Sequence, residues 1–81
     1  MAKLYIVDLS VEEKEQLFEL TSRGQASARK MKRAQILLLA DEGKKDETIV
    51  EMLHVGRATV ERIRKRFVLE GLTTALNERP R

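Results

Sequence analysis

The segment from residue 46 to residue 67 constrains this chain most, because two apolar patterns of helical spacing meet there across a short turn. The apolar positions allow two helices to share one buried seam, and they are Ile49, Leu53, Val55, Val60, Ile63 and Phe67. The second of the two helices is rich in arginine and lysine. A short helix, a tight turn and a basic helix are typical of a DNA-binding helix-turn-helix, whose second helix enters the major groove.

The basic helix is expected to follow Gly56 and to end at Glu70. At about 100° per residue, Val60, Ile63 and Phe67 fall on one side, which we expect to be buried. The opposite side should point into the major groove and contact bases, and it carries Ala58, Glu61, Arg62 and Lys65. Residues beside the seam should reach phosphates, which position a protein without specifying sequence; they are Arg57, Thr59, Arg64 and Arg66.

Each base-contact candidate has a role that follows from its chemistry. Arg62 suits a bidentate contact to O6 and N7 of a guanine, and Lys65 suits the same atoms with less directionality. Ala58 is expected to touch the methyl group of a thymine. Glu61 has two interpretations, since it either accepts from a cytosine amino group or pairs with Lys65 four residues on, and the ion pair is favoured.

Charge is segregated along the chain, although the net charge is only +3 over 81 residues. The amino-terminal part is acidic, with Asp8, Glu12, Glu13, Glu15 and Glu19. Besides the basic helix, a second basic cluster runs from Arg29 to Arg33 and begins another helix, where cations oppose the helix dipole. We therefore expect Arg29 or Arg33 to contact a DNA phosphate, and we expect double-stranded DNA as the partner.

Caps and breaks predict two helices before the helix-turn-helix. Ser10 and Glu13 form a capping box that begins a helix ending near residue 22. The apolar face of that helix is expected to comprise Val11, Leu17, Phe18 and Leu20. Ser27 should cap a second helix that ends at Glu42 before Gly43. Residues 34–40 are apolar nearly all round, so we expect this second helix at the centre of the fold.

The remaining boundaries follow from the same signals. Asp46 is expected to cap the third helix and Gly56 the fourth. The fourth should end in a Schellman motif, in which Leu72 closes back on Phe67. Residues 73–81 are mostly polar and contain the only proline, so they read as a linker or tail. The chain thus divides into an arm (residues 1–9), a helix-turn-helix domain (residues 10–72) and a tail (residues 73–81), with an all-α fold of about four helices.

The arm from Lys3 to Leu9 is rich in β-branched and aromatic residues, and it is expected to be extended. A lone strand is not stable by itself. The sequence leaves three alternatives open: the arm packs on the helices, pairs with a second chain in a homodimer, or stays loose.

Several kinds of chemistry find no support in the sequence. There is no cysteine, and the single histidine, His54, has no partner for a metal cluster, so we expect no metal, cofactor or catalytic residue. The position of His54 suits a residue of positive φ in the turn. Met31 and Met52 are interpreted as core. No apolar run approaches the ~20 residues of a membrane span, and a reduced, cytoplasmic setting is expected.

Three stretches in this order resemble the amino-terminal domain of mariner-like bacterial insertion-sequence transposases: residues 5–10 (YIVDLS), residues 33–43 (RAQILLLADEG) and residues 59–72, which contain TVERIRKRF and end in EGL. Residues 75–81 are similar to the linker that leads into the catalytic domain of those enzymes. The sequence departs from the family's usual residues at Val50, His54 and Gly56, where alanine, glycine and serine are common.

The resemblance implies a homeodomain-like helix-turn-helix that binds the terminal inverted repeats of a transposable element. Strand transfer in that family belongs to an RNase-H-like domain, and these 81 residues do not contain its acidic triad. We therefore expect a sequence-specific DNA-binding protein without catalytic activity, associated with a bacterial nucleoid when bound. Two alternatives are a small transcriptional regulator and a protein-interaction module that dimerises through the amino-terminal strand.

Overall fold

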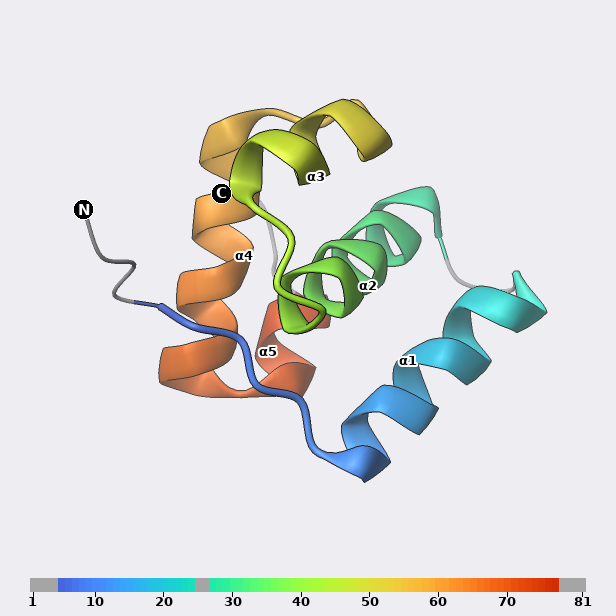
Figure 1. The fold of residues 1–81 in the computed structure, drawn as a ribbon. Helices are drawn as coiled ribbons and strands as arrows, with labels where there is room; N and C mark the ends of the chain where they lie inside the picture. Colours follow the sequence, from blue (N-terminus) through green and yellow to red (C-terminus); the bar gives the residue numbers. More distant parts are fainter. Residues whose placement is uncertain (1–4, 25–26, 78–81) are drawn as a thin grey trace.

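The computed structural model describes residues 5–24 and 27–77, and these form five α-helices and no β-strand (Figure 1). The helices are α1 (Val11–Arg23), α2 (Ala28–Asp41), α3 (Asp46–Leu53), α4 (Arg57–Glu70) and α5 (Leu72–Leu76). The predicted all-α bundle is confirmed, with one helix more than expected. Among the described residues, no helix is both long enough and apolar enough to cross a membrane.

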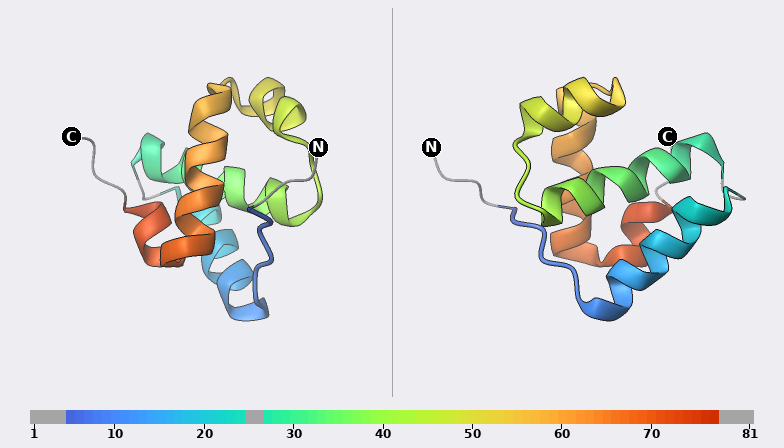
Figure 2. Two further views of the ribbon diagram at one scale, coloured as in Figure 1. Left: turned by 90° about the vertical axis from the view of Figure 1, so that its left-hand side faces the viewer. Right: turned by 45° about the vertical axis from the view of Figure 1, so that its right-hand side comes forward.

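Helix α2 lies at the centre of the bundle, as its apolar sequence predicted. It contacts each of the other four helices, and the views in Figure 2 show them arranged around it. Its side chains Ala34, Ile36 and Leu37 are fully buried. Because a helix that is apolar on several sides needs cover on several sides, this position follows directly from the sequence.

Side-chain caps fix the beginnings of α1 and α2. The Glu13 backbone N–H donates to the Ser10 hydroxyl at 3.1 Å, and the Ser10 N–H donates to the Glu13 carboxylate at 2.9 Å. The Ser27 hydroxyl accepts from the Lys30 N–H at 3.2 Å. The predicted cap of α3 is wrong, since Lys45 is the N-cap and Asp46 is the buried first residue of the helix.

The chain after α4 does not begin a polar tail, as the sequence had indicated. Gly71 has φ 96° and ψ 174°, which is not the left-handed helical conformation of a Schellman ending. Leu72 instead begins α5, where Leu72, Ala75 and Leu76 are buried. The expectation of a tail is therefore corrected for residues 73–77, and residues 78–81 lie outside the described part of the chain.

The described part of the arm packs on the helices, which was the first of the three alternatives. Val7 and Leu9 are buried in the core, whereas Ile6 before them and Asp8 between them are exposed. The Leu9 N–H donates to the Asp41 carboxylate at the end of α2, with a distance of 2.8 Å. The side chains of the described arm are thus alternately exposed and buried, as in an extended chain, although these residues do not form a strand. Residues 3 and 4 of the predicted extended segment lie outside the described residues.

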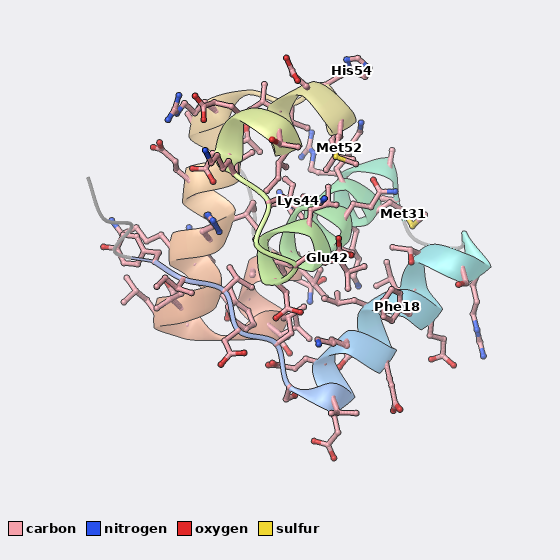
Figure 3. All side chains as sticks on the ribbon, viewed as in Figure 1. Phe18, Met31, Glu42, Lys44, Met52 and His54 are labelled. Carbon is pink, nitrogen blue, oxygen red and sulfur yellow. The ribbon has the colours of Figure 1, made fainter. Side chains whose placement is uncertain are left out.

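The apolar face predicted for α1 is only partly buried. Leu17 is fully buried and Leu20 packs against the core, but Val11 and Phe18 are exposed. Met52 is likewise exposed, and Met31 is half-buried, so the interpretation of both methionines as core is corrected. Figure 3 shows Phe18, Met31 and Met52 on three different helices.

Candidate nucleic-acid interface

The turn between α3 and α4 has the conformation that its sequence predicted. His54 is the C-cap of α3, with φ 57° and ψ 48°, and its N–H donates to the Val50 carbonyl at 2.9 Å. Its imidazole lies at the corner of the two helices and points away from the bundle (Figure 3). Gly56 is the N-cap of α4, with φ −74°. A left-handed residue here ends α3 abruptly, so that α4 begins in a new direction.

Helix α4 is oriented as the helical period predicted. Val60 and Ile63 are fully buried, and Phe67 packs partly buried against the core. The opposite side is exposed, and it carries all four base-contact candidates, Ala58, Glu61, Arg62 and Lys65. The structure therefore brings these four side chains together on one accessible surface, which we call the outer face of α4.

Glu61 does not make the ion pair with Lys65 that the sequence favoured. Its carboxylate lies 3.5 Å from Nε of Arg57, four residues earlier, and the two side chains are 60% and 58% exposed. Exposed pairs of this spacing contribute only about 0.3–0.5 kcal/mol. A phosphate therefore competes easily for Arg57, and Lys65 stays available for other contacts.

The residues beside the seam of α4 differ in exposure. Arg57 is exposed, whereas Thr59 and Arg66 are half-buried. Arg66 donates to the carboxylate of Glu70, four residues later on the helix, at 3.2 Å. These three residues keep polar atoms at the borders of the outer face, where the walls of a groove would lie.

Arg64 is not placed to contact a phosphate, which corrects the expectation for this residue. Its Nε donates to the Asp46 carboxylate at 3.0 Å, and the exposed fractions of the two side chains are 9% and 1%. Asp46 is the first residue of α3. The buried ion pair therefore ties the beginning of α3 to the middle of α4 and helps to set the angle between them. Arg64 is four residues after the buried Val60 and therefore lies on the same side of the helix. This spacing was a signal in the sequence that Arg64 would be buried.

The basic cluster at the start of α2 is also used mainly inside the fold. Arg33 is buried, and its Nη1 donates to the Leu76 carbonyl at 3.1 Å, which holds α5 against α2. The Lys32 ammonium donates to the Leu53 carbonyl at the end of α3, where a cation suits the helix dipole. Of the two phosphate candidates in this cluster, Arg33 is excluded by its burial and Arg29 is exposed.

Together these features define a class of protein. A short helix, a turn with one left-handed residue and a second helix that exposes the basic side chains Arg57, Arg62 and Lys65 form a helix-turn-helix DNA-binding domain. Residues 27–76, which comprise α2 to α5, match the model of the homeodomain-like domain family, so the chain belongs to this family. No curated protein and no solved structure was found to match. Helix α1 precedes the matched residues.

Proposed function

We propose that this chain binds double-stranded DNA in a sequence-specific manner, and that its target is the end of a transposable element. The observation that supports specific binding is the outer face of α4, where Arg62 and Lys65 are exposed on the side opposite the fully buried Val60 and Ile63. The target is supported by the likeness of three sequence stretches to insertion-sequence transposases.

The dimensions of α4 suit a major groove. The helix has 14 residues, and at 1.5 Å per residue it is roughly 21 Å long. Ala58 and Lys65 are two turns apart, which corresponds to roughly 10 Å along the helix and to about three base steps of 3.4 Å. We propose that Arg62 reads a guanine near the middle of this footprint, with Ala58 and Lys65 contacting its neighbours. Glu61 accepts from a cytosine when Arg57 turns to a phosphate.

Phosphate contacts are proposed for the accessible residues around this footprint. Arg57 and Thr59 lie in the first turn of α4, whose backbone N–H groups have no side-chain cap. Arg66 borders the outer face farther along, and Arg29 extends the basic surface from the start of α2. Each of these groups positions the domain on either wall of the groove.

The test is fluorescence anisotropy of labelled duplexes, titrated with the whole chain at several salt concentrations. One duplex carries an inverted repeat sought in the DNA that flanks the gene, a second carries the promoter region of the gene, and a third carries a scrambled repeat. We expect tightest binding to the inverted repeat and a linear decrease of log K with log salt concentration. Equal affinity for the scrambled duplex would contradict specific recognition, and tightest binding to the promoter would favour a transcriptional regulator instead.

A further inference from the structure

Two exposed apolar side chains lie on one side of α1. Val11 and Phe18 are 71% and 53% exposed. They are seven residues apart, which is about two turns of the helix, so they share one stripe. Figure 3 shows Phe18 on the same side of the molecule as Met31 of α2, which is half-buried. We call the surface formed by Val11 and Phe18 the α1 patch.

The border of the α1 patch is acidic. Glu12, Glu15 and Glu19 are exposed along the adjoining side of α1. Lys14, which lies on the other side of the patch, is held by the Asp41 carboxylate at 3.3 Å. Glu19 has an exposed partner in Arg23, four residues later. The exposed side of α1 is therefore negative and apolar, although the whole chain has a net charge of +3.

The position of the α1 patch separates it from DNA. Helix α1 packs on α2, and α4 lies on the other side of α2 in Figures 1 and 2. A duplex on the outer face of α4 would leave the patch uncovered. The glutamates that border the patch would also repel the phosphates of a second duplex. The α1 patch consequently suits a protein partner.

A second copy of this chain is a poor fit for the same surface. In an antiparallel two-fold dimer of α1, the same patch meets itself and the acidic border of one copy lies beside the acidic border of the other. Like charges brought together in this way oppose association. In a parallel dimer, the acidic border lies beside Lys14, whose ammonium is already paired with Asp41. The complementary partner has apolar side chains beside lysine or arginine, which is the pattern of a basic amphipathic helix.

We propose that the α1 patch docks a basic amphipathic helix of another protein, which lies along α1 and places apolar side chains about seven residues apart against Val11 and Phe18. Its lysine or arginine residues lie against Glu12 and Glu15. The patch is small, so the complex is weak and transient. This proposal does not depend on the DNA target, because the patch and the outer face of α4 are separate surfaces.

The experiment uses nuclear magnetic resonance of the whole chain, titrated with a synthetic helical peptide of leucine, alanine and lysine. A second peptide has the same leucines but glutamate in place of lysine. We expect the lysine peptide alone to shift the signals of the Phe18 ring and the Val11 methyl groups. Phe18→Ser should weaken this binding by at least roughly tenfold, as for a central apolar contact. Met52→Ser is the matched control, because Met52 is equally exposed, at 53%, on α3.

Charge provides a second, independent variant should Phe18→Ser fail to fold. Glu15→Lys should weaken binding of the lysine peptide and permit binding of the glutamate peptide, whereas Glu51→Lys on α3 should change neither. The proposal would be overturned by equal binding of the two peptides, by binding that Phe18→Ser and Glu15→Lys leave unchanged, or by no binding up to about 1 mM peptide. Sedimentation of the chain without peptide as a dimer that Phe18→Ser dissociates would also overturn it, in favour of self-association.

Discussion

Replacement of Arg64 by methionine tests the buried ion pair between α3 and α4. The Arg64 and Asp46 side chains are 9% and 1% exposed, with 3.0 Å between Nε and the carboxylate. Arg64→Met keeps much of the aliphatic stem but leaves the Asp46 charge buried without this partner. Removal of one member of a buried pair costs about 3–5 kcal/mol. A domain of this size has a total stability of roughly 4–12 kcal/mol, so the variant should lose a large fraction of it.

A second substitution separates the cost of the unpaired charge from the value of the pair. Arg64 Nη1 is buried and has no hydrogen-bond partner in the described structure, so the guanidinium is imperfectly satisfied. An imperfectly satisfied buried pair gains little over uncharged side chains of similar shape. The double variant Asp46→Asn/Arg64→Met should therefore recover most of the stability that Arg64→Met alone loses.

The assay is urea unfolding followed by circular dichroism for the wild type, Arg64→Met, Asp46→Asn and the double variant. We expect the midpoint to fall strongly for Arg64→Met, with an unchanged slope m, and to rise again in the double variant. Thermal unfolding should show the same order, with a decrease of about 4–8 °C for each kcal/mol lost. A loss below about 0.5 kcal/mol for Arg64→Met, as for a surface residue, would refute the reasoning. It would show that the guanidinium is exposed in solution and accessible to a phosphate.

Three further outcomes follow from the structure. Arg62→Ala should reduce discrimination at one base pair by about 1–3 kcal/mol, whereas Arg66→Ala should weaken binding to all duplexes alike, as measured with a panel of singly substituted duplexes. Arg33→Met removes the donor to the Leu76 carbonyl and should lower the free energy of unfolding by about 1–3 kcal/mol, with little change in the salt dependence of DNA binding; a change in that dependence would indicate a phosphate contact. His54→Gly should raise the free energy of unfolding by up to about 1 kcal/mol, because glycine adopts positive φ without steric cost, and a decrease in urea midpoint would contradict this.

The sequence predicted the features that depend on neighbouring residues. The burial of Val60 and Ile63 and the exposure of Arg62 and Lys65 follow from the helical period alone. The capping box at Ser10 and the positive φ of His54 are local in the same sense. Each prediction required only a few consecutive residues, so the absence of tertiary information did not affect it.

The features that the sequence did not reveal are set by contacts between distant residues. Asp46 and Arg64 are 18 residues apart, and Arg33 and Leu76 are 43 apart, so no periodic pattern links them. Helix α5 is too short to be stable alone and forms because its apolar residues are buried against other helices. Phe18 shows the converse, since an apolar residue on a helix is buried only when another element covers it.

The division of cations between the core and the surface predicts how strongly salt should affect DNA binding. The sequence alone nominated five charged side chains for phosphates, namely Arg29, Arg33, Arg57, Arg64 and Arg66. With a slope of about −0.9 for each neutralised phosphate, five contacts would give about −4.5 for log K against log salt concentration. The burial of Arg33 and Arg64 leaves three of them, which lowers the expected magnitude to about −2.7. The anisotropy titrations measure this slope directly on a duplex that carries the inverted repeat. A slope near −4.5 would contradict this count, because about two further cations, buried or exposed, would have to contact phosphates.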